Sequence, residues 1–511
     1  MAMLAAPITV TDPDAVDAAI ELARAAQLQG ADLVEWRVDT LADDAAGHAS
    51  VVQLVQEAPL PCIVTCRAAA EGGAFDGPEA HRVALLQALL DVEAAPRYLD
   101  LEFDAWRADN ALQGVASLLR AKGTALVLSH HDFVRRPANL LRCIAEMGEA
   151  DCDVIKVAWH VNAVREALEC ADVLASQPKP MIALAMGEAG LISRVMTGAW
   201  GGLLTFAALD GNAATASGQP TLSHLIERYR FRSINEQTRL YGLVGWPLGD
   251  SPGLPKHNEM FVECGWNAVY LPLPVREGWE RFKADMLSCI DHPRLPLGGV
   301  SVTMPHKANC LGLVQEAGGP ICDAATAAGA SNTLIISPDG AMRAANTDVV
   351  GVIEPLRALG ATFTGAAAAV LGAGGAARAA CVGLLQAGAS VRVFNRTSQR
   401  AQAVADDLAS VGDIAVGGVE AEKSGLFDIV VQCTSVGMAH GDQPEGDAVA
   451  AVGFDVAMVA DHAVCLESVY DPLETVFVKA MRAAGAQVAT GNEMWARQAA
   501  AQQALWAEGG W

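Results

Sequence analysis

The stretch DVIKVAW at residues 153–159 decides the fold class, because it places one lysine inside an apolar, β-branched run. Val154, Ile155 and Val157 are typical of a strand that is buried in a parallel sheet. A charged amine on such a strand is costly unless it is paired or neutral. Lys156 therefore either lies at the end of the strand and reaches water along its stem, or is a desolvated amine that can form a Schiff base with a ketone.

The first 225 residues alternate similar apolar stretches with helical patterns. The other candidate strands are DLVEWRVD (32–39), PCIVTCR (61–67), RYLDLEF (97–103), TALVLSHH (124–131), PMIALAM (180–186) and GLLTFAAL (202–209). About eight parallel strands joined by helices predict an α/β fold of the (β/α)8 barrel type, in which the strand ends share one site. The polar residues at or just past such ends are Glu35, Arg37, Arg67, His131, Lys156 and Arg194. Their coincidence favours the catalytic interpretation of the lysine.

A second βα series begins at residue 239, after a polar segment, 226–238, that is predicted to be a linker. In it, AAAAVLGAGGAARAA (366–380) combines a strand, a glycine turn and a helix of small residues, and the strand SVRVFNRT (390–397) follows at the expected distance. This is the Rossmann arrangement, in which the turn binds a dinucleotide. We therefore expect a barrel over 1–225, a substrate-binding α/β lobe over 239–345 completed by a C-terminal helix at 491–511, and a Rossmann lobe over 346–490.

The end of the strand at 390–397 indicates the cofactor. An NAD site usually places an acidic residue there, on the ribose 2′-hydroxyl. This chain instead has Asn395, Arg396 and Thr397, with Arg400 one turn later. A guanidinium suits a 2′-phosphate, so the sequence predicts NADP(H). A basic turn that only faces solvent is the alternative.

Composition limits the partners. The net charge of −24 disfavours nucleic acid and anionic membranes, because both bind basic surfaces, but it allows a small anionic substrate held by a few arginines. The 12 cysteines show no CxxC pair and no zinc-type spacing, so we expect free thiols and no metal. No apolar run could span a bilayer, and the N-terminal sequence lacks the marks of a secretory or transit signal. We expect a cytoplasmic protein, or one of the plastid stroma if a transit peptide was removed, with small-molecule substrates; a monomer is compatible with the sequence.

Six motifs follow one another in the N-terminal half: EWRVD (35–39), TCRAAAEGG (65–73), SHHDF (129–133), IKVAW (155–159), MGEAGLISR (186–194) and ASGQP (216–220). In this order they resemble type I 3-dehydroquinate dehydratase over roughly residues 5 to 225. The resemblance implies a (β/α)8 lyase in which Lys156 forms an imine with the substrate ketone and His131 is the general acid and base. A protonated imine is a better electron sink than a carbonyl, and an imidazole can take and return the proton.

The same resemblance implies further roles in this half. Glu71 would orient His131, while Arg194 and Arg67 would hold the substrate, Arg194 by a bidentate contact to its carboxylate. The remaining implied contacts are those of Glu35 and Arg37, of Gln219 from a closing loop, and of Thr215, which stands where the family usually has a serine. His130 should point to the opposite face from His131 and be packed or solvated, because neighbours on a strand alternate.

The C-terminal half, about 239–511, resembles shikimate dehydrogenase. The matching motifs are VGWPLGDSPGLPKHN (244–258), SVTMPHK (301–307), GASNTLI (329–335), AANTDVVG (344–351), LGAGGAARA (371–379), FNRT (394–397), CTSVGM (433–438), VYDPLET (469–475) and GNEMWARQAAAQ (491–502). The resemblance implies reduction of 3-dehydroshikimate with NADPH by a catalytic pair, Lys307 and Asp348. An ammonium held by a carboxylate can donate to, or polarise, the oxygen that hydride transfer turns into an alkoxide.

The resemblance also implies substrate and cofactor contacts in this half. The substrate contacts are Ser251, Gly253, Thr303, Asn332, Asn346, Tyr470, Gln498 and Gln502, the last two lying four apart on one helix face. The cofactor contacts are Gly372, Ala373, Gly374, Gly375, Ala376, Asn395, Arg396, Thr397, Arg400, Thr434 and Gly491.

One position departs from the dehydrogenase pattern. The family has Ser-x-Ser-Pro, and this chain keeps Ser251 but has Gly253 at the second serine. The lost hydroxyl removes a hydrogen bond to a charged group worth about 1.5–3 kcal/mol and opens space beside the carboxylate carbon, where quinate carries an extra hydroxyl. Thr303 matches the shikimate-type pattern instead, so both substrates stay open, as does neutral drift at this position.

These observations predict a fused dehydroquinate dehydratase and shikimate dehydrogenase that converts 3-dehydroquinate to 3-dehydroshikimate and then to shikimate. One alternative is a dehydratase joined to an enzyme that acts mainly on quinate. An alternative of another class is a regulator that binds ligands without turnover. Such a regulator should have lost its chemical residues, and here Lys156, His131, Lys307 and Asp348 are all present.

Overall fold

The computed structural model describes residues 2–93, 95–176, 178–209, 217–249, 251, 253–418, 426–439 and 441–509. The chain divides into two compact units. The first unit comprises residues 1–243 and 247–297, and the second comprises residues 244–246 and 298–511.

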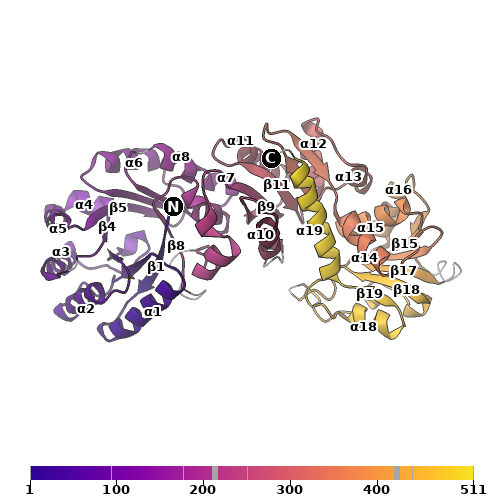
Figure 1. Cartoon of the computed structure of the whole chain (residues 1–511), viewed down its shortest axis with the longest axis horizontal. Coiled ribbons are helices and arrows are strands. Elements are labelled where there is room, and N and C mark those ends of the chain that lie inside the picture. Colours follow the sequence, from indigo (N-terminus) through magenta and orange to yellow (C-terminus); the bar gives the residue numbers. More distant parts are fainter. Residues whose placement is uncertain are drawn as a thin grey trace. The chain divides into compact units, whose positions relative to one another are not determined.

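The first unit begins with eight parallel strands and their helices. The strands are β1 (Met3–Thr9), β2 (Leu33–Arg37), β3 (Cys62–Thr65), β4 (Tyr98–Glu102), β5 (Ala125–Asp132), β6 (Val154–His160), β7 (Met181–Met186) and β8 (Leu204–Phe206). The helices are α1 (Val16–Leu28), α2 (Ala45–Gln56), α3 (Glu79–Ala88), α4 (Phe103–Ala108), α5 (Asn110–Ala121), α6 (Leu140–Glu149), α7 (Val164–Ala167), α8 (Glu169–Ser176) and α9 (Leu191–Val195). Figure 1 shows the helices from indigo α1 to magenta α8 on the outside of the strands.

The eight strands close into a barrel. Their order is β7-β6-β5-β4-β3-β2-β1-β8, and the amide of Leu203 donates to the carbonyl of Met181 at 2.9 Å, which joins the two ends of the series. Each strand sends apolar side chains into the interior: Ala5, Leu33, Ile63, Tyr98, Val127, Val154, Ile182 and Leu204 belong to one buried cluster. Such a layer fills the lower part of the barrel, so the predicted (β/α)8 fold is confirmed, with β1 as the strand that the sequence patterns did not single out.

The first unit continues beyond the barrel with β9 (Arg239–Gly245), α10 (Gly253–Glu263), β10 (Ala268–Pro274) and α11 (Trp279–Asp291). Arg165 of α7 donates to the buried Asp285 of α11 at 2.9 Å. The segment predicted as a linker contains two buried aromatic residues, Tyr229 and Phe231. In this segment, Arg232 forms an ion pair of 2.7 Å with Asp32. The segment therefore has buried positions and an ion pair to the barrel, while residues 235–237 are exposed.

The second unit contains two sheets. In the first, β11 (Leu297–Val302), β12 (Thr333–Ile336) and β13 (Met342–Ala345) pair antiparallel, accompanied by α12 (Lys307–Glu316), α13 (Asp323–Ala328) and α14 (Asp348–Ala358). The strands of the second sheet are β14 (Ala367–Leu371), β15 (Ser390–Phe394), β16 (Ile414–Val416), β17 (Phe427–Gln432), β18 (Val459–Glu467) and β19 (Gln487–Ala489). Its helices are α15 (Gly375–Gln386), α16 (Ser398–Leu408), α17 (Ala448–Val452), α18 (Val476–Ala483) and α19 (Gly491–Glu508).

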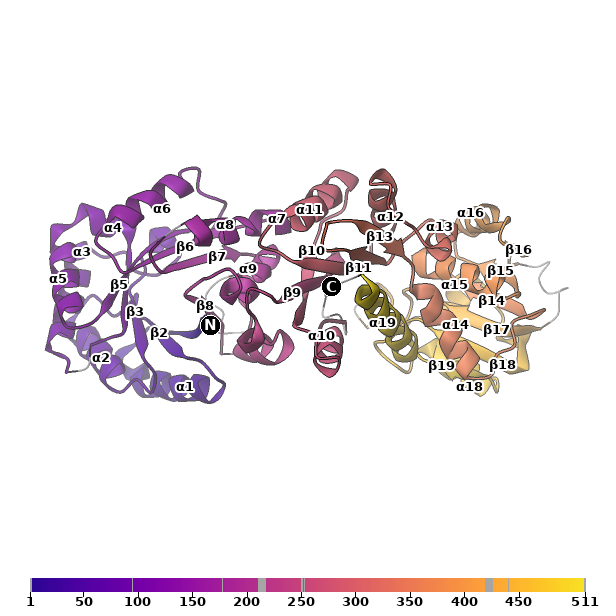
Figure 2. The ribbon, with the colours of Figure 1, turned by 45° about the horizontal axis from the view of Figure 1, so that its top comes forward.

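The second sheet is doubly wound. Its parallel strands have the order β16-β15-β14-β17-β18-β19, which is the Rossmann order, with a switch point between β14 and β17. Side chains alternate between two buried layers: Ala368 and Val370 face α14 to α16, while Ala369 and Leu371 face α17 and α18. Figure 2 shows α14 and α15 on one side of these strands and α18 on another.

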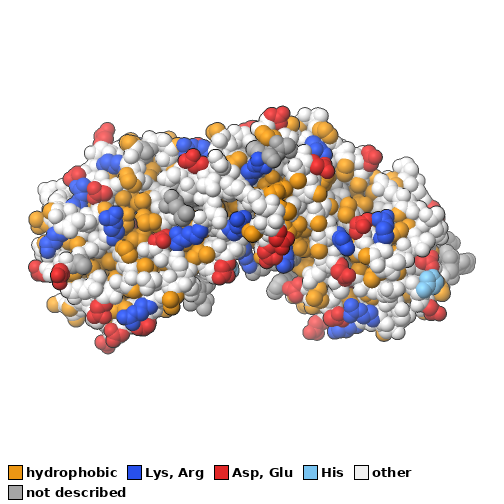
Figure 3. Space-filling model, in the orientation of Figure 1, with side chains coloured by type: hydrophobic (Ala, Val, Ile, Leu, Met, Phe, Trp, Pro, Cys, Tyr) orange, Lys and Arg blue, Asp and Glu red, His pale blue; other side chains and the backbone are white. Residues whose placement is uncertain are grey.

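The surface mixes charges of both signs. On the face drawn in Figure 3, basic and acidic side chains are interspersed among white and orange atoms. Of the helices in the described ranges, none has both the length and the apolar character that a membrane crossing needs.

Candidate active sites

The barrel carries a cavity at the carboxyl-end side of its strands, above the apolar layer. Its wall is formed by Glu35, Arg37, Arg67, Glu71, His131, Phe133, Lys156, Ala158, Leu184, Met186, Arg194, Phe206 and Gln219. All barrel residues predicted from the sequence thus come together there except Thr215, which lies outside the described residues. Lys156 is the third of the seven residues of β6 and is only 6% exposed, so it does not reach bulk water from the end of its strand.

Lys156 is held by carboxylates. Its Nζ donates to Asp100 Oδ2 at 2.7 Å and lies 3.5 Å from Glu35 Oε1. Thr65 fixes that Glu35 oxygen by donating to it at 2.9 Å, and the ring of Phe206 has its centroid 4.5 Å from Nζ. The lysine is therefore a paired ammonium under an aromatic cover, and it must pass a proton on before it can attack a carbonyl carbon.

Asp100 also forms an ion pair with Arg67. The guanidinium donates to Asp100 Oδ1 at 2.8 Å and to the hydroxyl of Ser129 at 2.7 Å, and Ser129 donates to the same carboxylate at 2.6 Å. Burial alone would raise the pKa of Asp100, but the cations of Arg67 and Lys156 outweigh it and hold that pKa well below its usual range. Asp100 is thus a fixed anion between two cations.

His131 and Glu71 form the second polar group of the cavity. Glu71 Oε2 lies 2.9 Å from His131 Nδ1 and accepts the His131 backbone amide at 3.0 Å. Burial lowers the pKa of His131, and the cations of Arg67 and Lys156 lower it further, so the imidazole is neutral at pH 7. Burial raises the pKa of Glu71 to about 8, against the opposing effect of Arg67. With its Nδ1 tied to Glu71, the ring leaves Nε2 for proton transfer.

His130 lies on the other side of the same carboxyl group. Its Nδ1 is 3.7 Å from Glu71 Oε1, and it is not part of the cavity wall. The prediction that only one of the two neighbouring histidines enters the cavity is therefore met by the geometry, with Glu71 between them.

Arg194 is a buried cation that faces the cavity without an anion beside it. It is 2% exposed, and within the part of the chain that the structure describes no carboxylate lies within ion-pair distance of it. Burial lowers its pKa to about 10, which reflects the missing counter-charge. A buried guanidinium without a partner is costly, so the cavity favours an anionic ligand such as a carboxylate.

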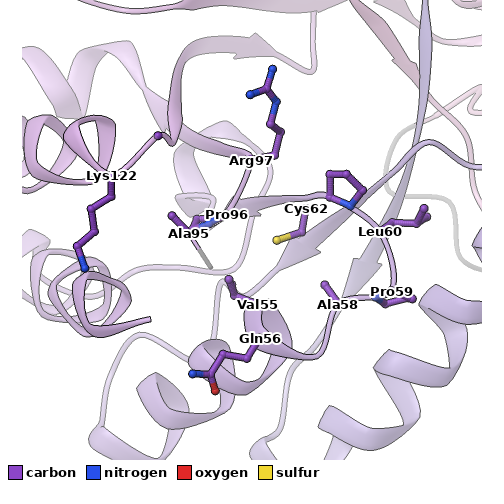
Figure 4. Close-up of a pocket in the computed structure, with 12 residues that line it drawn as sticks. Val55, Gln56, Ala58, Pro59, Leu60, Cys62, Ala95, Pro96, Arg97 and Lys122 are labelled. Atoms are coloured by element: carbon purple, nitrogen blue, oxygen red, sulfur yellow. The ribbon is translucent and has the colours of Figure 1, made fainter. Parts of the chain in front are cut away.

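The barrel has a second, larger cavity, in which charged side chains do not point toward one another. It measures about 490 Å³ and is lined by Val55, Gln56, Ala58, Pro59, Leu60, Pro61, Cys62, Ala95, Pro96, Arg97, Lys122 and Gly123, at the amino ends of β3 to β5. Figure 4 shows the side chains of Arg97 and Lys122 pointing in different directions, with Cys62 apart from both. Burial raises the pKa of the Cys62 thiol to about 12, so it stays protonated. Size alone therefore does not identify the reactive cavity.

Three residues of the barrel site were missed by sequence reasoning: Asp100, Glu102 and Ser129. A signal was present, because Asp100 and Glu102 are two apart on the apolar strand RYLDLEF and must share one face. Acidic residues that face the interior of a barrel need cations opposite them.

The second unit joins Lys307 and Asp348. Lys307 Nζ donates to Asp348 Oδ2 at 2.5 Å, and Asn332 donates to Asp348 Oδ1 at 2.8 Å. Lys307 opens α12 and Asp348 opens α14, so each side chain stands at the first residue of a helix. The largely buried carboxylate of Asp348 therefore holds the Lys307 side chain in one orientation.

Buried amides hold this pair in place. Asn346 accepts the Asp348 backbone amide at 3.1 Å and donates to the Ala330 carbonyl at 3.0 Å. Gln502 of α19 donates to the Asn332 carbonyl at 3.2 Å and to Thr333 Oγ1 at 3.0 Å, and accepts from Ser301. Gln502 thus fixes the strand that carries Asn332, whereas Gln498, one turn earlier, is half-buried beside Gly351.

The glycine turn lies at the switch point of the doubly wound sheet. Gly372 has φ +117°, and a Cβ there would lie 3.1 Å from the Cys433 backbone and 3.3 Å from Thr434 Cγ2. A Cβ on Gly374 would meet nothing within 4 Å, which leaves open space at the start of α15. The stem of Lys307 reaches within 3.5 Å of a Cβ on Gly375, so the turn adjoins the Lys307–Asp348 pair. A backbone this bare beside a helix N-terminus fits a pyrophosphate.

The other predicted cofactor and substrate residues are placed as follows. Arg396, Thr397 and Arg400 are exposed after β15, and Asn395 donates to the Thr397 carbonyl at 2.9 Å. Half-buried residues of this unit are Thr303, Ala373, Ala376, Thr434 and Tyr470, and Gly491 is buried at the start of α19. Ser251 and Gly253 belong to the first unit, where the Gly253 amide, at the start of α10, donates to Ser251 Oγ at 3.3 Å.

The chain matches two families. The type I 3-dehydroquinase family matches residues 4–236, and the shikimate dehydrogenase substrate binding domain matches residues 243–334. Among solved structures, the dehydroquinate dehydratase and shikimate dehydrogenase of S. pombe covers 99% of this chain and 96% of its own, at 24% identity and a TM-score of 0.43. A shikimate dehydrogenase of Thermus thermophilus, solved with NADP(H) and shikimate, covers 53% of this chain and 94% of its own, at 27% identity and a TM-score of 0.44.

Sequence relatives agree with both matches. The chloroplastic bifunctional 3-dehydroquinate dehydratase/shikimate dehydrogenase of Arabidopsis thaliana is 30% identical over 349 residues, 68% of this chain. The match spans 55% of that relative, about half its length. The 3-dehydroquinate dehydratase of Methanosarcina acetivorans is 32% identical over 207 residues, 39% of this chain and 85% of its own length. These relatives support neither a preference for quinate nor a regulator without turnover. Through residues 4–236 the chain belongs to the type I 3-dehydroquinase family, and it joins that domain to the substrate-binding domain of a shikimate dehydrogenase at 243–334.

Proposed function

We propose that this chain dehydrates 3-dehydroquinate to 3-dehydroshikimate in its barrel and reduces 3-dehydroshikimate to shikimate with NADPH in its second half. The observation that carries the proposal is the barrel cavity, which combines a buried lysine with a buried arginine that has no carboxylate beside it among the residues that the structure describes. Lys156 supplies an amine for a ketone, and Arg194 supplies a cation for a carboxylate. A substrate with both groups satisfies both side chains at once.

The dehydration follows from the positions of the side chains. Lys156 loses a proton, attacks the ketone carbon and releases water to form a protonated imine. His131 then removes the proton α to the imine carbon, and the electron pair moves toward the iminium nitrogen. The same imidazole returns the proton to the β-hydroxyl, which leaves as water, and hydrolysis frees Lys156. Glu71 keeps the His131 ring in one orientation throughout.

The reduction uses the pair in the second unit. Bound NADPH supplies the hydride for the ketone carbon. Lys307 donates a proton, or a strong hydrogen bond, to the oxygen that becomes the alkoxide, while Asp348 holds the ammonium in place. The open backbone of the glycine turn supports pyrophosphate binding, and exposed Arg396 and Arg400 support selection of the 2′-phosphate.

The same proposal covers the remaining contacts and boundaries. Substrate contacts are assigned to Glu35, Arg37, Arg67, Thr215 and Gln219 in the barrel, and to Ser251, Gly253, Thr303, Asn332, Asn346, Tyr470, Gln498 and Gln502 in the dehydrogenase half. We assign the functional boundaries to 1–225, 226–238, 239–345 with 491–511, and 346–490. A reducing compartment, the cytoplasm or a plastid stroma, suits a chain with 12 scattered cysteines and no CxxC pair.

Two measurements on the full chain test the proposal. With 3-dehydroquinate and NADPH together, we expect NADPH oxidation to begin after a short lag, since the barrel must first make the ketone that is reduced. With 3-dehydroquinate and borohydride, we expect a covalent adduct that peptide mass spectrometry places on Lys156. An active protein that yields no adduct would exclude the imine mechanism, and NADPH left unoxidised with added 3-dehydroshikimate would exclude the reduction.

A further inference from the structure

A chain of alternating charges runs from the rim of α3 to the reactive lysine of the barrel. We call it the ion chain; its members in order are Glu79, Arg82, Glu102, Arg67, Asp100 and Lys156. Arg82 donates twice to Glu79, at 2.8 and 2.6 Å, and once to Glu102 Oε2. Glu102 Oε1 lies 3.2 Å from Arg67 Nη1, and Arg67 and Lys156 share the two oxygens of Asp100.

The inner members of the ion chain are almost fully buried. Arg82 is 1% exposed, Glu102 and Arg67 are each 3% exposed, and Asp100 is 2% exposed. Only Glu79 reaches the surface, with 37% of its side chain exposed. Water screens such charges poorly, so a change at one member acts on the next. The ion chain is therefore a single electrostatic unit.

Arg82 touches neither the cavity nor any group that reacts. Beyond these ion pairs, Arg82 donates to the Cys66 carbonyl at 3.1 Å, and its guanidinium lies 5.1 Å from the centre of the Phe75 ring. Burial would lower its pKa, but Glu79 and Glu102 raise the pKa above the usual arginine value, so the charge is permanent. The proposed dehydration gives this buried cation no task.

Glu102 divides its two oxygens between two arginines. Oε2 accepts from Arg82, and Oε1 accepts the Ala68 backbone amide at 2.8 Å and faces Arg67. Because Arg82 neutralises Glu102, the guanidinium of Arg67 stays available to Asp100. Its Nη2 donates to Asp100 directly, and its Nη1 donates to Ser129, which also binds Asp100. Asp100 then offers Lys156 a carboxylate whose charge is already half compensated.

We propose that Arg82 is a positioning residue for Lys156, acting through Glu102, Arg67 and Asp100 to limit how tightly the lysine's proton is held. The inference rests on the proposed function of Lys156 as the imine-forming amine. Without Arg82, Glu102 draws Arg67 away from Asp100, and the full charge of Asp100 acts on the ammonium. Less amine is then available for attack on the ketone near neutral pH.

Several charged groups face Lys156, and the test must separate them. Asp100 approaches from β4, Glu35 from β2, Arg67 from the end of β3 and His131 from β5. None of these four is altered in the variants that follow. Arg120 of α5 is the matched control, because it forms a bidentate pair with Asp153, at 2.8 and 2.8 Å, outside the ion chain.

The experiment measures the pH dependence of adduct trapping with 3-dehydroquinate and borohydride, and of kcat/KM for dehydration, on the full chain. For Arg82→Met we expect the acid limb of both profiles to move up by about one pH unit, with activity recovered at alkaline pH. Arg82→Lys should restore most of the shift. Arg120→Met should leave the profile in place, even where its melting temperature falls.

Glu79→Gln gives an effect of opposite sign and spares the barrel interior. The substitution removes the negative charge of Glu79, so the Arg82 cation neutralises Glu102 more completely. The Lys156 ammonium is then less stabilised, and the acid limb should move to lower pH. Opposite shifts in Arg82→Met and Glu79→Gln support the inference, and a merely structural role would lower the rate equally at every pH. If Arg82→Met fails to fold, the direction of the Glu79→Gln shift decides alone: an unmoved or raised limb overturns the inference. Absence of the Lys156 adduct in the unaltered chain would instead overturn the proposed function.

Discussion

The molecule contains two lysine–aspartate pairs that differ in their surroundings. Lys156 is 7% exposed at its side chain and lies 2.7 Å from Asp100, while Lys307 is 20% exposed and lies 2.5 Å from Asp348. The first pair has a second carboxylate, Glu35, and sits deep in a barrel. The second pair stands at two helix starts beside a glycine turn. A lysine next to an aspartate therefore does not define a reaction.

The surroundings suggest two tasks for the same pair. Under the proposed function, the amine in the barrel must become a nucleophile, and a network of buried charges surrounds it. In the second unit, the ammonium must keep its proton until an oxygen needs it, and a single carboxylate with a fixed amide partner suffices for that. The following predictions test whether the two pairs work independently.

The largest expected effect comes from Lys156→Ala. Dehydration should fall by about 10⁴-fold or more, because no other amine of the cavity wall can form the imine. Reduction of added 3-dehydroshikimate should stay within about twofold, an allowance for small rearrangements between independent sites. Parallel assays of the two half-reactions check this, and a joint loss would break the separation of the two pairs.

The reciprocal change is Lys307→Ala. We expect reduction to fall by about 10²–10⁴-fold, the usual contribution of a positioned acid, while dehydration continues. NADPH should still bind, since the glycine turn is unchanged, and fluorescence titration of NADPH measures this. Retained reduction would show that the proton comes from another group.

Sequence patterns anticipated Lys156 and both members of the Lys307–Asp348 pair, but not Asp100, the carboxylate that pairs with Lys156. The motifs name Lys156, Lys307 and Asp348 directly, and the strand and glycine patterns predict the barrel and the doubly wound sheet. Asp100 was missed because it reaches Lys156 across the strand between them, and such pairing depends on the register of the barrel, in which Ser129 lies opposite Lys156.

Gln502 shows the same limit in the second unit. Its place in a helical motif predicts a contact with substrate, which stays a prediction; the motif does not predict its hydrogen bonds to Asn332 and Thr333, some 170 residues earlier in the chain. A helix pattern shows which residues share a face but not which strand that face meets. A single motif therefore cannot predict which residues its side chains contact when those contacts depend on tertiary packing.

Arg194→Met sharpens the comparison, because among the described residues the barrel site has a buried arginine with no carboxylate at ion-pair distance, and the second site does not. We expect the KM for 3-dehydroquinate to rise by about 10–100-fold, the loss of a charged hydrogen-bonded contact worth about 1.5–3 kcal/mol. Removal of a buried charge should also raise the melting temperature. The control is Arg136→Met, which breaks an exposed bidentate pair with Glu169 and should leave KM unchanged. An unchanged KM in Arg194→Met would contradict the carboxylate clamp.

Arg396→Ala concerns the second site alone. If its guanidinium binds the 2′-phosphate, the ratio of kcat/KM for NADPH over NADH should fall by about tenfold, and dehydration should not change. Arg392→Ala is the control, because Arg392 lies on β15, just before Arg396 in the sequence, but pairs with Asp413. A preference that survives Arg396→Ala would assign the phosphate to Arg400 or to another group.

The smallest expected effect is a pH slope in stability that belongs to the barrel. The pKa of Glu71 is about 8 in the folded protein, against an ordinary value of 4.5, because burial disfavours its carboxylate. Between these two values the folded state binds more protons than the unfolded state, so the stability of the barrel should decrease as pH rises through this window. The slope from this group is at most about 1.4 kcal/mol per pH unit. Glu71→Gln keeps the neutral shape and should remove the slope, which hydrogen exchange of the β3 to β5 amides in the full chain can follow from pH 5 to 8. The β14 to β17 amides serve as the internal reference, because Glu71 belongs to the other unit. A slope that persists in the barrel of Glu71→Gln would show that a group other than Glu71 produces it.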